Sequence, residues 1–150
     1  MKKACVIGVV FALGIALLNS GCIPLEKLYG YSAWVVGDVA KDGKAMILYS
    51  DDSGGSWSRQ GTDVLPDGEN LSDVYAVSMY EVWAVGSGGL LIKTNNGGKN
   101  WKVVDLPDEL KAGELAHISI FEDDIWLSGN EGLIGFSKDG GKSWTVADLP

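Results

Sequence analysis

Short apolar segments separated by turn residues fill the chain from about residue 27 onward. In the middle of the chain they predict strands at about 72–78, 82–86, 90–95 and 100–106. Polar and apolar residues alternate poorly within the segments, as in the V-W-A-V run that starts at Val82, and such runs are typical of strands covered on both faces. Glycine and asparagine between the segments supply the positive φ angles that tight hairpins require. The pattern predicts antiparallel sheets stacked on one another.

The segments form a unit that occurs three times. The second half of each unit carries the skeleton Ser/Thr-x-Asp/Asn-x-Gly-x-x-Trp, and its Ser/Thr positions are 44 and then 43 residues apart. This period is typical of a four-stranded propeller blade. The skeleton residues are Ser50, Asp52, Gly54 and Trp57, then Thr94, Asn96, Gly98 and Trp101, then Ser137, Asp139, Gly141 and Trp144.

The repeat predicts an all-β protein of three four-stranded antiparallel blades, at about residues 27–66, 67–107 and 108–150. A closed propeller ring normally has at least about four blades, so these three are expected to be part of a larger propeller. An open stack leaves an apolar sheet face bare at each end. The chain is therefore expected to be a piece of a longer propeller, with function in its missing blades, or to self-associate, with six blades from two chains as the simplest ring.

The skeleton resembles the Asp-box, or bacterial neuraminidase, repeat, in which the box is the hairpin between the third and fourth strands of a blade. An Asp or Asn side chain at the second position accepts hydrogen bonds from the backbone downstream and so closes a turn. The box tryptophans are expected to fold back over their hairpins and to be buried. Catalysis or metal binding by Asp52 and Asp139 is the alternative, but residues repeated at the blade period do not converge on one site.

A basic start and an apolar run at residues 4–18 predict a signal peptide at residues 1–21. The run is short for a membrane span. The small residues before Cys22 resemble a bacterial lipoprotein signal, in which the cysteine becomes the lipidated first residue; Asn19 departs from the Leu that this family prefers. Residues 22–26 would then be the lipidated cysteine and a short tether. An ordinary secretory signal is the alternative.

Charge and cysteine content narrow the class of partner. The chain has a formal net charge of −8, which becomes −10 when removal of residues 1–21 takes away Lys2 and Lys3 and no acid. This excess of negative charge argues against nucleic acids and anionic lipid surfaces as partners.

The cysteine content supports the predicted lipid anchor. Cys5 lies within the predicted signal, so acylation of Cys22 accounts for a thiol that would otherwise be alone on an exported chain. We expect no cofactor and no metal site.

The pattern V-W-A-V-G-x-x-G-x-x-x-x-T-x-N-G-G-x-x-W that starts at Val82 resembles the photosystem II assembly and stability factor family, and the resemblance extends over residues 27–150. It implies an exported propeller without cofactor or chemistry, which holds a membrane-protein subunit during assembly. A membrane-anchored scaffold facing the periplasm or the cell surface, with a protein partner at or in the membrane, is therefore the leading hypothesis.

A fragment of an exported Asp-box glycoside hydrolase or carbohydrate-binding propeller is the alternative. A sialidase uses three arginines for its substrate carboxylate, and this chain has one, Arg59, in an expected outer strand. No pair of acids stands out as the two carboxylates of a glycosidase. His117, the single histidine, is expected to be a packed or edge residue. The charged connection from Gly37 to Met46 is longer than its counterparts and is expected to be a solvated loop or a place of binding specificity.

Overall fold

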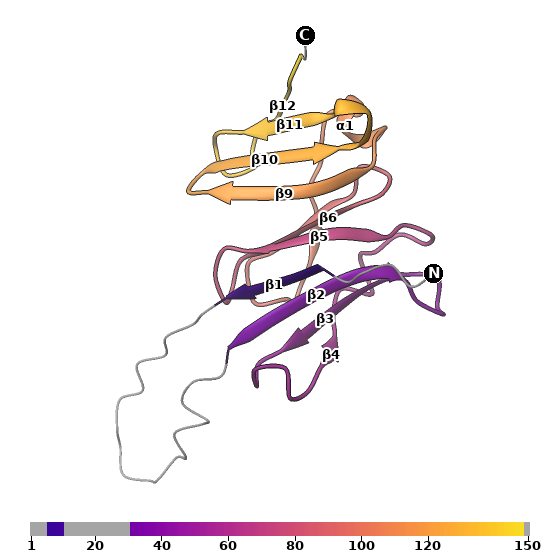
Figure 1. Cartoon of the computed structure of the whole chain (residues 1–150), viewed down its shortest axis with the longest axis vertical. Coiled ribbons are helices and arrows are strands. Elements are labelled where there is room, and N and C mark those ends of the chain that lie inside the picture. Colours follow the sequence, from indigo (N-terminus) through magenta and orange to yellow (C-terminus); the bar gives the residue numbers. More distant parts are fainter. Residues whose placement is uncertain (1–5, 11–30, 149–150) are drawn as a thin grey trace.

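Three four-stranded antiparallel sheets are stacked along the long axis of the molecule in the computed structural model, which describes residues 6–10 and 31–148 (Figure 1). We refer to them as blades 1, 2 and 3 in chain order. Blade 1 consists of β1 (Val6–Val10), β2 (Ser32–Val39), β3 (Ala45–Ser50) and β4 (Ser58–Arg59). Blade 2 consists of β5 (Leu71–Ala76), β6 (Val82–Gly86), β7 (Leu91–Thr94) and β8 (Lys102–Val103). Blade 3 consists of β9 (Leu115–Phe121), β10 (Asp124–Gly129), β11 (Ile134–Ser137) and β12 (Thr145–Val146).

The prediction of an all-β fold with repeated four-stranded sheets is confirmed. In blade 2 the predicted strand 82–86 coincides with β6, whereas the predicted strand 100–106 shrinks to the two residues of β8. β8 pairs only with β7, and both of its residues are exposed. A strand paired on one side and bare to water gains little from further length, so the outermost strands are short.

The innermost strand of blade 1 has an unexpected source. β1 pairs antiparallel with β2, from Val6 opposite Val36 to Val10 opposite Ser32. These residues lie in the apolar run that sequence analysis assigned to the signal peptide, and the predicted blade at 27–66 contributes only the other three strands of the sheet. A β-branched apolar run suits an inner strand as well as a signal core. The predicted cleavage before Cys22, which lies outside the described residues, stays a prediction.

The linker from blade 2 to blade 3 contains a single helical turn that sequence analysis did not predict. α1 (Asp108–Lys111) follows Pro107, whose ring fixes a φ compatible with a helix start. The Leu110 side chain of this turn is fully buried against blades 2 and 3. A second short turn, the 3-10 helix η2 (Asn130–Gly132), connects β10 to β11. The linker therefore contributes to the core as well as joining the blades.

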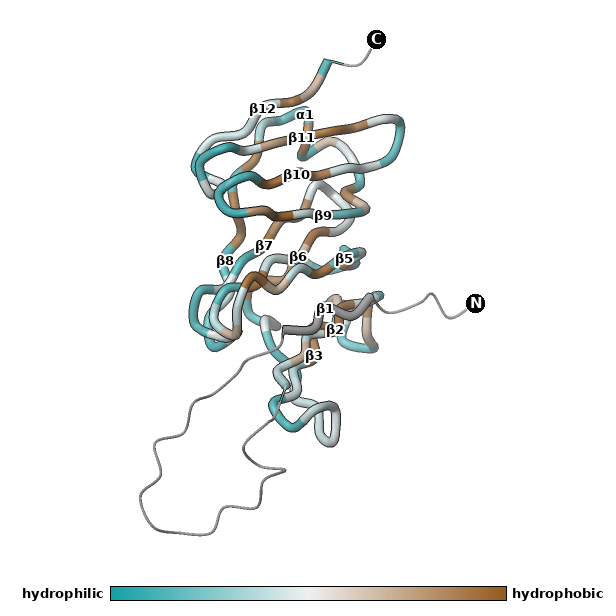
Figure 2. Tube along the Cα trace, turned by 60° about the vertical axis from the view of Figure 1, so that its left-hand side comes forward, coloured by the Kyte–Doolittle hydropathy of each residue, from teal (hydrophilic) through white to brown (hydrophobic). Residues whose placement is uncertain are grey.

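The hydrophobic core lies between the blades in two separate clusters. Figure 2 shows hydrophobic stretches along strands of all three blades. All five residues of β6 are buried because this strand has a neighbouring blade on each side. Val82 and Ala84 belong to the cluster against blade 1, and Trp83 and Val85 belong to the cluster against blade 3. Successive side chains of β6 thus alternate between the two faces of the sheet, as in any strand, but both faces are apolar. This explains the unbroken apolar run in the sequence.

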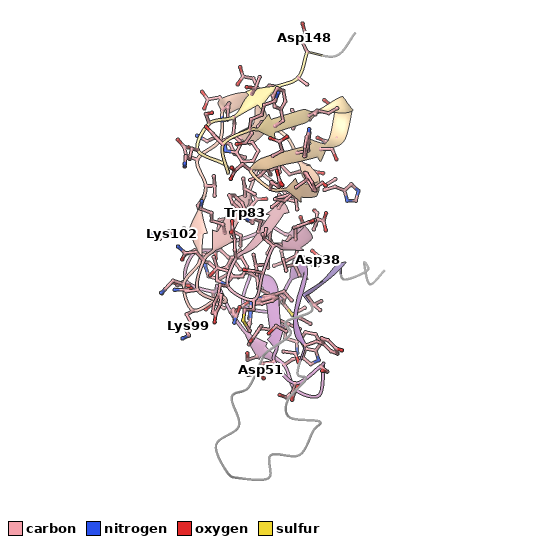
Figure 3. The ribbon with its side chains drawn as sticks, turned by 90° about the vertical axis from the view of Figure 1, so that its left-hand side faces the viewer. Asp38, Asp51, Trp83, Lys99, Lys102 and Asp148 are labelled. Atoms are coloured by element: carbon pink, nitrogen blue, oxygen red, sulfur yellow. The ribbon has the colours of Figure 1, made fainter. Side chains whose placement is uncertain are left out.

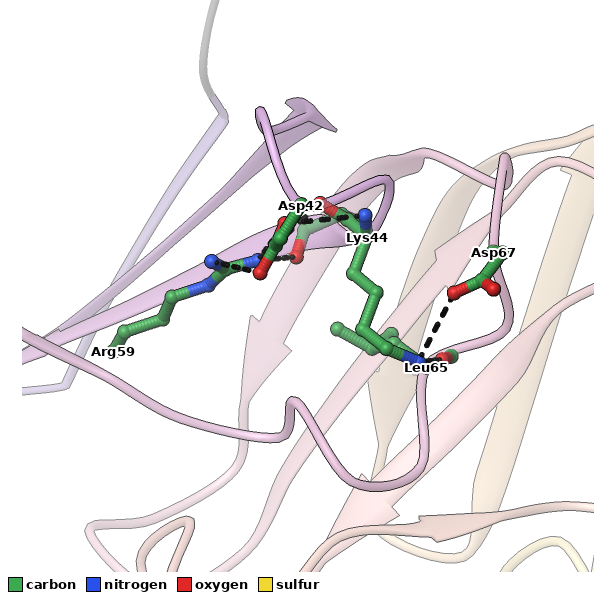
Figure 4. A network of polar contacts seen from close by, with 6 residues as sticks. Asp42, Lys44, Arg59, Leu65 and Asp67 are labelled. Atoms are coloured by element: carbon green, nitrogen blue, oxygen red, sulfur yellow. Dashed lines mark hydrogen bonds and ion pairs between the residues drawn. The ribbon is translucent and has the colours of Figure 1, made fainter.

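The charged hairpin between β2 and β3 is fastened to its own blade and is not a free loop (Figure 4). Arg59 on the outer strand β4 donates hydrogen bonds to both carboxylate oxygens of Asp42, from Nη1 to Oδ2 at 2.6 Å and from Nη2 to Oδ1 at 3.1 Å. Lys44 Nζ donates to Leu65 O at 2.6 Å and lies 3.3 Å from Asp67 Oδ1. The Arg59 hydrogen bond lowers the pKa of Asp42. The hairpin therefore ties the outer strand to the linker toward blade 2.

Candidate binding surfaces

The three predicted boxes form hairpins of one design at the ends of β3, β7 and β11. In the first, Ser50 Oγ donates to Asp52 Oδ1 at 2.8 Å and accepts from Gly54 N at 2.8 Å. Ser56 then donates to Asp52 through both its backbone N and its Oγ, each at 2.8 Å. The Ser50 hydroxyl thus binds the backbone of Gly54, and the Asp52 carboxylate binds the backbone of Ser56. Both side chains close the turn, so Asp52 has a structural role.

The other two boxes repeat this arrangement with one variation. Ser137 Oγ donates to Asp139 Oδ1 at 2.8 Å and accepts from Gly141 N at 2.9 Å. In the middle box Thr94 Oγ1 accepts from Gly98 N at 3.0 Å and donates to Asn96 Oδ1, also at 3.0 Å. Asparagine therefore keeps the acceptor that the turn needs but carries no charge.

Hydrogen bonding to the carboxylates determines their ionisation. Bonds from the backbone and hydroxyl of Ser56, and from Ser50, lower the pKa of Asp52 to about 2. The hydroxyl and backbone of Ser143 lower the pKa of Asp139 still further below its usual range. Both groups stay ionised at neutral pH, so neither is suited to act as a general acid.

The boxes of blades 2 and 3 are each bound to the first hairpin of their own blade. Gly97 N donates to Tyr80 O at 2.9 Å in blade 2, and Gly140 N donates to Asp123 O at 2.9 Å in blade 3. Among the residues that the structure describes, no group of three His, Cys, Asp or Glu side chains is placed to hold a metal ion. The three boxes lie along one long side of the stack, and we call this side the box end (Figure 1).

The box tryptophans differ in burial, and the expectation that all three rings are buried is wrong for the first. Trp101 is 3% exposed and packs in the core between blades 1 and 2, and Trp144 is partly buried between blades 2 and 3. Trp57 is 44% exposed. A box ring is covered by the blade that precedes it, and no described sheet lies on that side of blade 1.

On the opposite side of the stack, which we call the linker end, residues of blades 1 and 2 and the residue just before blade 3 surround a polar hollow of about 190 Å³. Asp38 and Glu114 are exposed at its edge. Asn70 N donates to Ser87 Oγ at 3.0 Å on its floor, and Ser87 Oγ also bonds Glu69. The hollow is lined by Gly37, Asp38, Asn70, Leu71, Ser72, Ser87 and Glu114.

Two exposed carboxylates, those of Asp38 and Glu114, border this hollow. Asp38 lies on the opposite side of the stack from Lys99 and Lys102, which project from blade 2 (Figure 3). A second hollow at the linker end, about 460 Å³, is bordered by α1 and η2 and includes Glu109 and Glu131. Only the first hollow lies near the innermost strands, at the starts of β5 and β9, whereas the second reaches β11 and β12 in the outer part of blade 3.

The remaining sequence candidates are not part of either hollow. His117 is not packed: it lies on the edge strand β9 with 75% of its side chain exposed, and its Nδ1 is 3.6 Å from Asp73 Oδ2. Arg59 lies in the outer strand β4, as predicted, and is engaged by Asp42. No helix in the described part of the chain is long and apolar enough to span a membrane.

Sequence reasoning did not identify the polar hollow or the residue that joins blades 1 and 2. Gln60 accepts from Trp34 Nε1 at 3.2 Å and donates to Gly97 O at 3.2 Å, and so connects a blade 1 strand to the blade 2 box. Gln60 lies outside the repeated skeleton. The one local signal for the hollow is the polar residue that follows a glycine of the second strand: Asp38 and Ser87 line this hollow, and their counterpart Asn130 lines the larger one.

Three stacked four-stranded sheets with a hydrogen-bonded box in each define a β-propeller protein of the Asp-box type. Within that class, residues 62–150 match the family model described as photosynthesis system II assembly factor YCF48. The match includes more than half of the chain, and the chain belongs to this family.

Two solved structures have a similar fold. The structure described as YCF48 bound to D1 peptide has a TM-score of 0.65 and 24% identity, and the match covers 77% of this chain and 36% of that chain. YCF48 from Cyanidioschyzon merolae has a TM-score of 0.59 and 22% identity, over 77% of this chain and 32% of that chain. This chain therefore spans about a third of the length of these propellers. No curated protein matches the sequence.

Proposed function

We propose that this chain is an exported, lipid-anchored scaffold that binds an extended, basic peptide segment of a membrane protein and performs no chemistry of its own. Family membership supports the class of function. A solved relative is described as bound to D1 peptide, so the fold accommodates peptides. The observation that carries the proposal is the acidic hollow at the linker end, which residues of blades 1 and 2 and the residue just before blade 3 surround.

The shape and charge of that hollow favour a peptide with lysine or arginine side chains. Asp38 comes from blade 1 and Glu114 lies just before blade 3, so a ligand that reaches both crosses the blade 2 residues that line the hollow. Ser72 and Ser87 between them offer polar contacts. Exposed carboxylates mainly accelerate association and select for charge. The boxes offer no comparable site, since their carboxylates are used within their own hairpins.

Binding is tested with two labelled peptides of equal length, one rich in lysine and the other with glutamate at the same positions, by fluorescence anisotropy. The lysine peptide should bind saturably, and binding should weaken as salt rises from about 50 to 500 mM. The double variant Asp38→Asn, Glu114→Gln should weaken binding about five- to tenfold. Asp51→Asn, which neutralises an exposed acid at the box end, is the matched control and should have no effect.

Equal binding of both peptides, or an equal effect of the control and the double variant, would contradict the proposed surface. The same preparation should leave a panel of glycosides intact. Saturable turnover of any of them would favour the glycoside hydrolase alternative instead.

A further inference from the structure

The outer edge of blade 2 carries a hollow of about 260 Å³ whose lining is entirely lysine and asparagine. Blade 2 packs against another blade on each of its two faces, so the hollow lies on the rim of the stack. It is found where β7 and β8 meet the box of this blade, and its lining residues are Lys93, Asn95, Asn96, Asn100 and Lys102. Every side chain around the hollow can donate hydrogen bonds, and none is acidic.

The two lysines of the hollow stand directly opposite each other on neighbouring strands. Lys93 of β7 pairs with Lys102 of β8, and side chains in such a register have Cβ atoms about 4.5–5.5 Å apart. Like charges at this separation repel each other and destabilise a sheet. Among the residues that the structure describes, neither lysine forms an ion pair with a carboxylate. The pair therefore lacks a counterion within the chain as described.

The same position in the other two blades carries no charge. Tyr49 pairs with Ser58 in blade 1, and Phe136 pairs with Thr145 in blade 3. A single lysine on the edge strand β8 would be an ordinary protection against the addition of another strand. Lys93, however, lies on β7, which has a strand on each side. Protection of the sheet edge therefore does not account for the pair.

The box beside the two lysines carries no carboxylate. Asn96 stands where the other two boxes have aspartate. Its Oδ1 accepts hydrogen bonds from Thr94 Oγ1 at 3.0 Å and from Asn100 N at 2.9 Å. Because that oxygen is used within the hairpin, the amide nitrogen is the group of Asn96 that remains to bind a ligand, and it is a donor.

The Lys93 side chain is held in place by the ring of a buried tryptophan. Lys93 Nζ lies 4.6 Å from the centroid of the Trp83 ring, a distance at which cation–π attraction operates. Trp83 is 1% exposed, and its Nε1 donates to Glu81 Oε1 at 3.0 Å. The Glu81 carboxylate is thus engaged by the indole, and one ammonium group of the hollow is positioned before a ligand arrives.

We propose that this hollow binds a doubly charged oxyanion, the phosphate group of a small, water-soluble molecule, between Lys93 and Lys102. A phosphate carries close to two negative charges and three strong acceptor oxygens, so one group neutralises both lysines and accepts from the asparagine amides. A single carboxylate would leave one lysine without a counterion. The net charge of −8 repels anionic lipid surfaces, which favours a source in solution over a lipid headgroup. The site lies on the side of the stack away from the acidic hollow and is independent of peptide binding there (Figure 3).

Binding is tested by NMR titration of the full chain with inorganic phosphate, at about pH 8 so that the ion is doubly charged. The chain carries Cys22→Ser to prevent lipidation, and sodium chloride keeps the ionic strength constant. The side-chain amide resonances of Asn96 and Asn100 should shift saturably. Lys102→Thr, which installs the residue that blade 3 has at this position, should raise the dissociation constant at least about tenfold. Lys41→Thr removes an exposed lysine from the blade 1 hairpin and, as the matched control, should bind like the parent.

Thermal denaturation gives a second measurement, which a merely solvated lysine pair would not affect in the same way. Without phosphate, Lys102→Thr should melt at a higher temperature than the parent because it removes the repulsion between like charges. Phosphate at ten times its dissociation constant should raise the Tm of the parent by about 3–5 °C. The Tm of Lys102→Thr should not respond, since that variant has lost one of the two charges that bind the ion.

Vesicles of phosphatidylcholine with and without phosphatidic acid distinguish the two sources of a phosphate group. The chain should sediment with neither. Sedimentation that requires phosphatidic acid and is abolished by Lys102→Thr would assign the site to a lipid headgroup and contradict the source in solution. The absence of saturable shifts, equal binding by Lys102→Thr and the parent, or an equal loss in Lys41→Thr would overturn the site.

Discussion

Two oxygen atoms organise each box: the hydroxyl of its first skeleton residue and one oxygen of the Asp or Asn two residues later. Both accept backbone N–H groups that would otherwise have no partner within the turn, such as those of Gly54 and Ser56. Asp52 and Asp139 therefore have a required structural role although they lie near the surface. Their hydrogen bonds lower the pKa of each carboxyl group, and they act by closing the turn.

The lowered pKa values of Asp52 and Asp139 predict how the box hairpins respond to low pH. Because the folded pKa of Asp52 is lowered from 3.8 to about 2, its box is stabilised above about pH 4, and that stabilisation is lost as the pH falls toward 2. The amide resonance of Ser56 should therefore titrate in NMR spectra with a midpoint near 2, and that of Ser143 at lower pH still. Asn100, which donates to the neutral Asn96, is the internal control. A Ser56 midpoint near 3.8 would show that the bond to Asp52 is absent.

The burial of the box tryptophans predicts unequal costs of truncation. Trp101→Ala should destabilise the chain by about 3–5 kcal/mol, as large deletions from a packed core do. Trp57→Ala removes the same ring from a half-exposed position and should cost about 1 kcal/mol or less. Urea denaturation in dilute solution measures both values. Equal losses would mean that the ring of Trp57 is covered in solution.

At the scale of the element, a box hairpin has two tasks that different residues perform. Its oxygens close the turn, and in blades 2 and 3 its skeleton glycine lets the turn approach the preceding blade. Gly98 is buried against Gln60 and Gly141 lies against Trp83, whereas Gly54 meets only its own hairpin. Identical local structure therefore has different packing in each blade.

Alanine substitutions at two glycines with nearly the same φ distinguish the cost of backbone strain from the cost of a packing clash. Gly98 and Gly43 have φ of 81° and 84°, and nothing lies within 4 Å of a Cβ at Gly43. Gly43→Ala should cost about 1 kcal/mol, the strain of a left-handed alanine. Gly98→Ala should cost about 1–2 kcal/mol more, because its methyl group displaces the Gln60 side chain and breaks the hydrogen bonds that Gln60 makes to Trp34 and Gly97. Thermal or urea denaturation of both variants tests this, and equal losses would contradict tight docking of the box.

At the scale of the whole molecule, the β1 strand at residues 6–10 lies within the predicted signal peptide. In the chain described here these residues complete blade 1 as β1, pairing with five residues of β2. If the chain is processed as a lipoprotein, they are removed with the signal and the inner edge of β2 is left for another strand. An unpaired edge is a template for β-addition, so processing and strand pairing are coupled.

Labelling with radioactive palmitate tests the proposed anchor. The wild type should incorporate label and Cys22→Ala should not, because acylation needs the Cys22 thiol. Cys5→Ala, which removes the other cysteine, is the matched control and should be labelled like the wild type. Stable attachment needs more than one acyl chain, so detergent should be required to release the labelled protein. Label in Cys22→Ala would contradict the anchor.

The sequence by itself determined the local structure. The residues that recur at the blade period predicted the β-fold, the number of repeats and the hairpin positions, because turn closure depends on neighbours two to four residues away, as between Ser50, Asp52 and Gly54. The limits of the buried strand β6 were also predicted, since its apolar run ends at glycine. Each of these features is set by interactions within a few residues of the chain.

Only the tertiary structure decided what the repeats do to one another. Trp57 and Trp101 occupy the same position in the skeleton, and the presence of a preceding blade is what buries one of them. The acidic hollow unites Asp38 and Glu114, which are far apart in sequence and lie outside the boxes. Burial and electrostatic environment depend on which surfaces face each other across a blade interface, and the local pattern of a repeat is the same whether or not its neighbour is there.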